Sequence, residues 1–176
     1  MFSMSLPTFF LAYEDYSQLT PASFKQVIEA TPTKAISEIT IGELCSMADY
    51  PNGLYFIFGG DSRQLQYVGK CTARSFIERI PAHFDQRAHA WFNTLPKKLM
   101  RNGQCYSAAL EESLKFEIVL FGIHDREAAC ELERVFRYSY KPLLNTLRRF
   151  NNFDANATLD KQGNPAHCSV QETVSL

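Results

Sequence analysis

Two tyrosines, Tyr55 and Tyr67, stand on either side of a Gly-Gly-Asp break in the stretch GLYFIFGGDSRQLQYVGK, and Lys70 closely follows the second. The branched and aromatic residues around the break predict a β-hairpin. With the loop centred on Asp61, Tyr55 lies directly opposite Tyr67, so both hydroxyl groups point from one face of the sheet. Such a pair is either a packing contact between two rings or a place where two phenols act on one ligand.

The same hairpin carries GLY at 53–55 and YVG at 67–69, which resemble the two halves of the signature of the GIY-YIG nuclease family. The segment FIERIPAHF at 76–84 is similar to the family's helix that bears an arginine and, four residues later, a histidine or tyrosine. Arg79 and His83 have this spacing, which places both side chains on one face of a helix.

A later segment, ELERVFRYSYKPLLNT, resembles the closing helix of the family, in which a glutamate precedes a proline by nine residues and an asparagine follows the proline by three. Glu133, Pro142 and Asn145 fit this spacing. Helical phase alone does not choose between Glu131 and Glu133, so only the family spacing selects Glu133. The β-prone run LKFEIVLFG lies where the family has its third strand, and the resemblance covers more than half of the chain.

The resemblance implies a divalent-metal-dependent endonuclease that hydrolyses DNA phosphodiester bonds, with double-stranded DNA as partner and Mg²⁺ or Mn²⁺ as cofactor. Glu133 would be the metal ligand, because Mg²⁺ needs only one or two carboxylates besides water and phosphate. Arg79 would bind the non-bridging phosphate oxygens through its planar guanidinium. His83 would assist at the phosphate or relay a proton. The alternative is a non-cleaving module of the same fold that binds DNA or a partner protein.

The resemblance also implies that Tyr55 is the catalytic base or orients the attacking water, with Tyr67 beside it. A free phenol has a pKa near 10, so a base at neutral pH requires about 4 kcal/mol of interactions that favour the phenolate. Lys70 and the metal are the cations available for this purpose. The sequence leaves open which tyrosine takes the proton.

Two further groups have candidate roles around this site. Asn145 is expected to close the turn after the last helix and to support Glu133 from behind. Lys97, Lys98 and Arg101 form a small basic cluster that either contacts DNA phosphates or is a solvated helix end.

An α+β framework must position these side chains. The patterns predict a small three-stranded sheet, made of a hairpin and a third strand and flanked by helices, as in GIY-YIG nucleases. Helices are expected to begin at Thr20, at Thr40 and at Ser75, the last two with capping boxes. The remaining elements are strands over 54–58, 65–68 and 114–121 and helical segments over 86–101 and 125–140.

Charge varies along the chain, although the net charge is −1. Residues 1–50 carry −4, residues 51–150 carry +5 and residues 151–176 carry −2. We expect these three segments to be an N-terminal helical extension, a GIY-YIG-like nuclease domain and a polar C-terminal extension. The basic middle segment fits an anionic partner, and the acidic first segment fits a scaffold or a homodimer surface better than a DNA grip.

The cysteines and the apolar segments exclude several classes of protein. The five cysteines are odd in number and include no CxxC pair, which argues against a disulfide framework or a structural zinc. No apolar run is long enough to span a bilayer, and the start of the chain has no basic region typical of a signal peptide. The expectation is a cytoplasmic protein without membrane contact.

Overall fold

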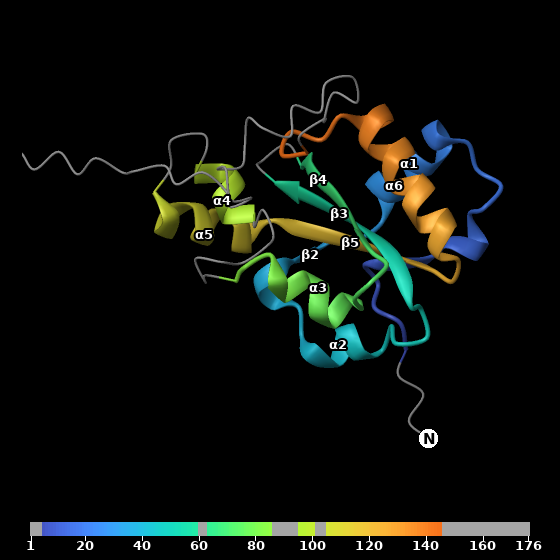
Figure 1. Cartoon of the computed structure of the whole chain (residues 1–176), viewed down its shortest axis with the longest axis horizontal. Coiled ribbons are helices and arrows are strands. Elements are labelled where there is room, and N and C mark those ends of the chain that lie inside the picture. The colour runs from blue at the N-terminus through green and yellow to red at the C-terminus, as the bar shows by residue number, and fades with distance from the viewer. Residues whose placement is uncertain (1–4, 60–62, 86–94, 101–104, 146–176) are drawn as a thin grey trace, which may run out of the picture.

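The computed structural model describes residues 5–59, 63–85, 95–100 and 105–145, which form one mixed sheet with helices on both faces (Figure 1). The strands are β1 (Phe10–Ala12), β2 (Lys34–Ala35), β3 (Asn52–Gly59), β4 (Gln64–Cys71) and β5 (Glu117–Ile123). The α-helices are α1 (Pro21–Ala30), α2 (Ile41–Cys45), α3 (Phe76–Ala82), α4 (Leu95–Met100), α5 (Tyr106–Lys115) and α6 (Arg126–Tyr140). Two 3-10 helices are η1 (Tyr13–Asp15) and η2 (Ile36–Glu38). No helix in these described ranges is long and apolar enough to cross a membrane.

The sheet has the strand order β1-β5-β3-β4, and β2 also pairs with β5. The three expected strands form its antiparallel part, with β3 between β5 and the edge strand β4. The expectation of three strands is wrong, because β1 adds to β5 in parallel and β2 adds in the antiparallel direction. The fold is therefore α+β, as predicted, with a larger sheet.

Alternation along the strands divides the core into two layers. In β3, Leu54, Phe56 and Phe58 pack on one face, whereas Tyr55 and Ile57 pack on the other. Helices α1 and α6 cover the first face, and α2 and α3 cover the second (Figure 1). This is the period of two that a strand buried on both faces requires.

Residues 5–50 are part of this core and do not form the helical extension that we expected. The strand β1 lies in the sheet, and Phe24 of α1 packs its ring 4.6 Å from Phe121 and 4.7 Å from Phe136. Burial of aromatic rings is a large stabilising term, so removal of residues 5–50 would expose the sheet.

The predicted helix starts are confirmed by their caps. Thr20 accepts from the backbone N–H of Ser23, and capping boxes begin α2 at Thr40 and α3 at Ser75. The run LKFEIVLF is split between two elements, because its first two residues end α5 and β5 begins only at position 117. Of the expected helix over 86–101, the structure describes α4, and the tail over 151–176 lies outside the described residues.

Candidate active site at the edge strand

The hairpin of β3 and β4 sets the relation between the two tyrosines. Tyr55 lies opposite Gly69, and Ile57 lies opposite Tyr67, so the expected direct pairing of the tyrosines is wrong by two residues. The connection between the strands shifts the pairing by one residue. An irregularity that leaves Gln66 without an opposed residue shifts it by one more. A shift of two preserves the face of every side chain, so both tyrosines still lie on one face. Their ring centroids are 5.9 Å apart.

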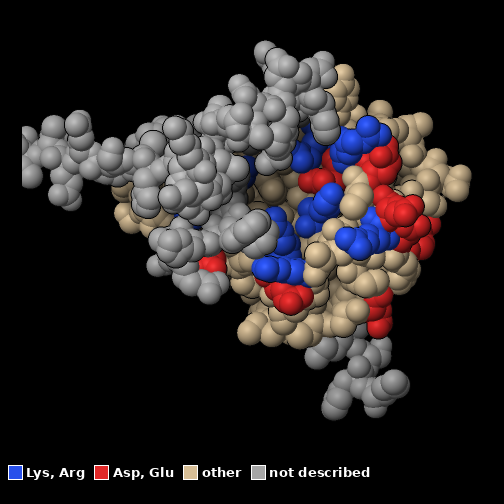
Figure 2. Space-filling view, in the orientation of Figure 1, with Lys and Arg blue, Asp and Glu red and all other residues tan. Residues whose placement is uncertain are grey.

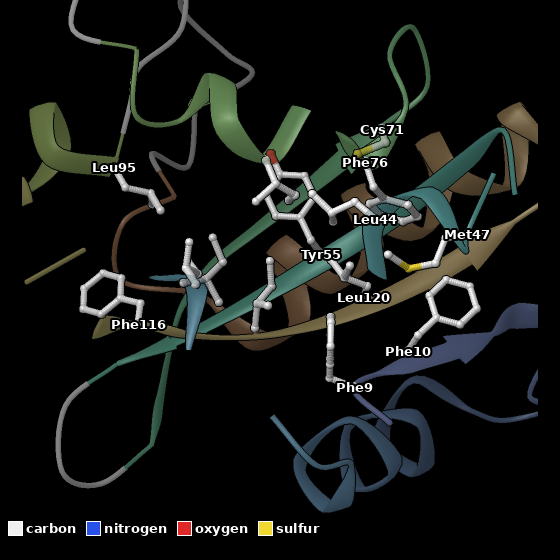
Figure 3. Close-up of a cluster of buried hydrophobic side chains, with 14 of the residues drawn as sticks. Phe9, Phe10, Leu44, Met47, Tyr55, Cys71, Phe76, Leu95, Phe116 and Leu120 are labelled. Carbon is white, nitrogen blue, oxygen red and sulfur yellow. The ribbon is translucent and has the colours of Figure 1, made fainter. Parts of the chain in front are cut away.

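Gly69 allows Tyr55 to lie across the neighbouring strand. A Cβ atom at position 69 would overlap the ring and the hydroxyl of Tyr55. The ring is completely buried in the core, and its hydroxyl points toward the helices above the sheet (Figure 3). The glycine of YVG is therefore required by the close approach of a side chain to the strand.

The Tyr55 hydroxyl and His83 form the centre of a buried polar cluster. The phenolic oxygen is 2.7 Å from Nε2 of His83, and both residues are buried. The charge of Arg79 also acts on this hydroxyl group. Burial raises the pKa of Tyr55 well above its ordinary value, Tyr67 adds to the rise, and the Arg79 charge only partly opposes it. Tyr55 is therefore a neutral phenol, which does not favour its expected role as the base.

Helix α3 presents Arg79 and His83 to one tyrosine, as their four-residue spacing predicts. Pro81 lies inside this helix without ending it, although proline lacks the N–H group that the helix would use. The turn after it is tightened, because His83 N–H bonds the carbonyl of Ile80 and Phe84 N–H bonds the carbonyl of Pro81.

His83 is a neutral imidazole in this setting. Burial lowers its pKa to about 3, and the charges of Arg79 and Lys98 act in the same direction. Its Nδ1 atom is buried and has no hydrogen-bond partner in the described parts of the chain. The donor in the bond between the Tyr55 hydroxyl and Nε2 depends on which ring nitrogen of His83 carries the proton.

We expect the burial of neutral His83 to make stability depend on pH. Its folded pKa of about 3 is below the ordinary value of 6.5, so stability is complete above pH 6.5 and falls as the pH falls. Between pH 7.5 and pH 5 the free energy of unfolding should decrease by about 2 kcal/mol, measured by urea unfolding. A His83→Asn variant should lose most of this decrease, and a His124→Asn variant, altered at an exposed histidine, should keep it. An equal decrease in wild type and His83→Asn would contradict the assignment.

A second cluster lies on the opposite face of the sheet, between β4 and α6. Lys70 Nζ is 3.2 Å from one carboxylate oxygen of Glu133, and Arg137 Nη1 is 3.3 Å from the other. Lys70 also donates to the sulfur of Cys130 at 3.5 Å. Burial alone would lower the pKa of Lys70, but the Glu133 carboxylate and the Cys130 sulfur raise it above its ordinary value.

The two clusters meet at the outer edge of β4. Tyr67 and Lys70 lie on opposite faces of this strand, yet Tyr67 is affected by charges from both sides. Burial raises the pKa of Tyr67, Arg79 acts to lower it, and Glu133 raises it further. Lys and Arg side chains gather on this face of the molecule, over α3, α6 and the strand between them (Figure 2). The six expected residues therefore lie in two clusters on the two faces of the sheet, and Tyr67, whose ring centroid is 5.5 Å from that of His83, is the residue on which charges from both clusters act.

The described part of the site offers one carboxylate to a divalent cation. Glu133 is a single carboxylate, and no group of three His, Cys, Asp or Glu side chains that could hold a metal occurs among the described residues. Mg²⁺ keeps several waters and commonly uses one or two carboxylates with substrate phosphates. Glu133 therefore meets the minimum requirement for such an ion and cannot form a metal site without another oxygen donor.

Asn145 has a different partner from the expected one. Its side-chain amide bonds both backbone groups of Val68, accepting from N–H at 2.7 Å and donating to the carbonyl at 2.9 Å. Leu144 N–H bonds the carbonyl of Gln66. Asn145 closes the turn after Pro142, as predicted, but it supports the edge of β4 and the backbone beside Tyr67, where we expected support of Glu133.

The basic cluster is also arranged differently from the surface cluster that we expected. Lys98 is buried, donates to the carbonyl of Leu144 at 2.7 Å and lies 4.9 Å from the centre of the Tyr67 ring. Lys97 is half-buried, and Arg101 lies outside the described residues. Lys98 therefore belongs to the interior of the candidate site.

Sequence reasoning missed Arg137 as a member of the site, and it named Lys98 only as part of a basic cluster at a helix end. The signal for Arg137 was its position four residues after Glu133, which puts both on one face of α6. The burial of Lys98 had no comparable signal, because it depends on the packing of Leu144 and Tyr67 around it.

Comparison with protein-family models, with curated proteins and with solved structures gave no match to this chain.

Proposed function

We propose that the protein is an endonuclease with a GIY-YIG-like site that hydrolyses DNA phosphodiester bonds. The observation that carries the proposal is the meeting of the two clusters at one strand edge. The phenol of Tyr55 joins Arg79 and His83, Lys70 joins Glu133, and Tyr67 is affected by both Arg79 and Glu133. A purely structural arrangement would not need so many charged groups around two phenols.

Arg79 is the residue suited to hold the scissile phosphate. Its charge acts on the hydroxyl groups of both Tyr55 and Tyr67, and the planar donors of a guanidinium match phosphate oxygens. The buried hydrogen bond between the neutral Tyr55 and the neutral His83 fixes the two side chains against each other beside Arg79. Such preorganised donors stabilise developing charge without reorganisation during the reaction.

Tyr67 is better placed than Tyr55 to contact the attacking water. Tyr55 is completely buried, whereas Tyr67 is partly exposed at the edge of the sheet. Burial raises the pKa of Tyr67 as well, so at neutral pH it acts as a neutral donor that orients the water. Glu133 would hold the divalent cation, which supplies Lewis-acid stabilisation of the phosphate and a more acidic bound water.

A second candidate function is a module of the same kind that binds nucleic acid without cutting it. The ion pairs of Glu133 with Lys70 and Arg137 favour this candidate, because both carboxylate oxygens are already engaged. The two candidates differ in one measurement, the conversion of supercoiled plasmid to nicked or linear forms in the presence of Mg²⁺ or Mn²⁺. Binding of the plasmid without conversion would support the second candidate.

Comparison of two arginine variants tests the site assignment. Arg79→Ala should reduce the cleavage rate at least about a hundredfold, because it removes a charged contact to the transition state. Arg74→Ala should leave the rate nearly unchanged, because Arg74 is exposed before α3 and acts on Glu78. Single-turnover plasmid cleavage measures both. Equal effects of the two substitutions would refute the role of Arg79.

A further inference from the structure

Arg137 is the residue of this site with no role so far. It lies one helical turn after Glu133 on α6 and contacts a carboxylate oxygen through Nη1 at 3.3 Å, while Lys70 holds the other oxygen. Only 14% of the Glu133 side chain is exposed, compared with 30% of Arg137. The carboxylate is therefore enclosed by two cations, of which Arg137 lies on the same helix face.

A carboxylate held in this way is a poor ligand for a free divalent cation. Lys70 and Arg137 flank Glu133, the assigned metal ligand, so these three residues together carry a formal excess of one positive charge. Such an excess repels a free cation and attracts a phosphate.

The contact between Arg137 and Glu133 is also of the kind that a phosphate can replace. Arg134, one turn away from Glu131, binds that exposed carboxylate through two nitrogens, at 2.6 Å and 3.1 Å. Arg137 reaches Glu133 through a single, longer contact. Guanidinium donors fit phosphate and carboxylate oxygens equally well in geometry, so a phosphodiester near Tyr67 competes directly for Arg137. The Arg137 charge already acts on the Tyr67 hydroxyl.

We propose that Arg137 is a phosphate-binding residue that occupies Glu133 until nucleic acid is bound, so that Glu133 holds a divalent cation only after a phosphodiester has taken over Arg137. This inference rests on the proposed function, because it assumes that the site binds a phosphodiester. It assigns the order of binding as nucleic acid first and metal second. Arg137 would therefore bind the phosphate and, before that, hold the Glu133 carboxylate in place.

Mn²⁺ binding to the protein without DNA tests the first half of the proposal. Electron paramagnetic resonance of free Mn²⁺ should show weak binding to wild type and at least about tenfold tighter binding to Arg137→Gln, since one positive charge beside the carboxylate is removed. Arg134→Gln is the matched control on the same helix and should match wild type. The double variant Arg137→Gln/Glu133→Gln should lose the gain. Equal Mn²⁺ affinity in wild type and Arg137→Gln would overturn the proposal.

DNA binding in the presence of EDTA tests the second half. Fluorescence anisotropy of a labelled duplex over a range of salt concentrations should show weaker binding by Arg137→Gln, with a slope of log affinity against log salt smaller by about 1. Arg134→Gln should keep the wild-type slope. Normal wild-type binding with an unchanged slope in Arg137→Gln would refute this inference alone. A wild-type protein that binds no duplex at any salt would refute the proposed function as well.

Discussion

Glu133→Gln is expected to reduce DNA cleavage by at least about a thousandfold, because the substitution removes the one carboxylate that could hold the divalent cation. Glutamine is the informative substitution here. Its amide oxygen still accepts a hydrogen bond from Lys70 or Arg137, whereas alanine would leave two partly buried cations facing each other. Single-turnover cleavage of plasmid at saturating Mg²⁺ measures the loss, and circular dichroism checks that the variant is folded.

The control for this prediction is Glu131→Gln. Glu131 lies two residues earlier on α6, and its carboxylate is exposed and paired with Arg134. We expect this variant to cut DNA at the wild-type rate, since surface ion pairs contribute little. If Glu131→Gln were inactive and Glu133→Gln active, the family spacing to Pro142 would have selected the wrong glutamate. Activity in both variants would remove the metal ligand from the proposed mechanism.

Gly69→Ala is expected to lower the free energy of unfolding by about 1–3 kcal/mol, because the new methyl group overlaps the buried ring of Tyr55. The overlapped atoms belong to a fully buried side chain, so the ring cannot move into solvent without exposing the core. Displacement of the ring should also break the contact between the Tyr55 hydroxyl and Nε2 of His83. Urea unfolding at pH 7.5 measures the change, and this prediction does not depend on the proposed function.

Gly42→Ala is the matched control for the backbone effect of the same substitution. Gly42 lies in α2, and a Cβ atom there would have its nearest neighbour at 3.9 Å, the side-chain oxygen of Thr40. Alanine has the higher helix propensity, so Gly42→Ala should be neutral or stabilising by about 0.5–1 kcal/mol. A Gly69→Ala protein as stable as wild type would mean that Tyr55 does not occupy the position across β4.

The relation between the two tyrosines illustrates what could be predicted of the site. The alternation of β3 and β4 placed Tyr55 and Tyr67 on one face, and that conclusion is insensitive to a register shift of two residues. The directly opposed partner of Tyr55 was predicted wrongly, because the register depends on the connection and on the irregularity at Gln66. Neither feature has a reliable signal in the order of residue types.

The roles of the titratable groups depended on burial in a way that the sequence does not express. A phenol in a hairpin can be exposed or buried, and only the packing of α3 over the sheet makes Tyr55 and His83 neutral partners. Lys98 was expected near the surface, yet its ammonium lies between Leu144 and the Tyr67 ring. Desolvation is a property of all surrounding elements together, so it appears only when they are assembled.

The sequence by itself determined the local elements of this protein: the hairpin, the capped starts of α1, α2 and α3, and the shared helix face of Arg79 and His83. These follow from periodicity and from hydrogen bonds within a few residues. Only the tertiary structure decided that β1 and β2 extend the sheet, that Asn145 pairs with Val68 and that Arg137 holds Glu133. The physical reason is that such features are not stable by themselves. Strands of two or three residues need a sheet edge that the rest of the fold leaves open. A single polar contact needs a partner group that the rest of the fold brings close.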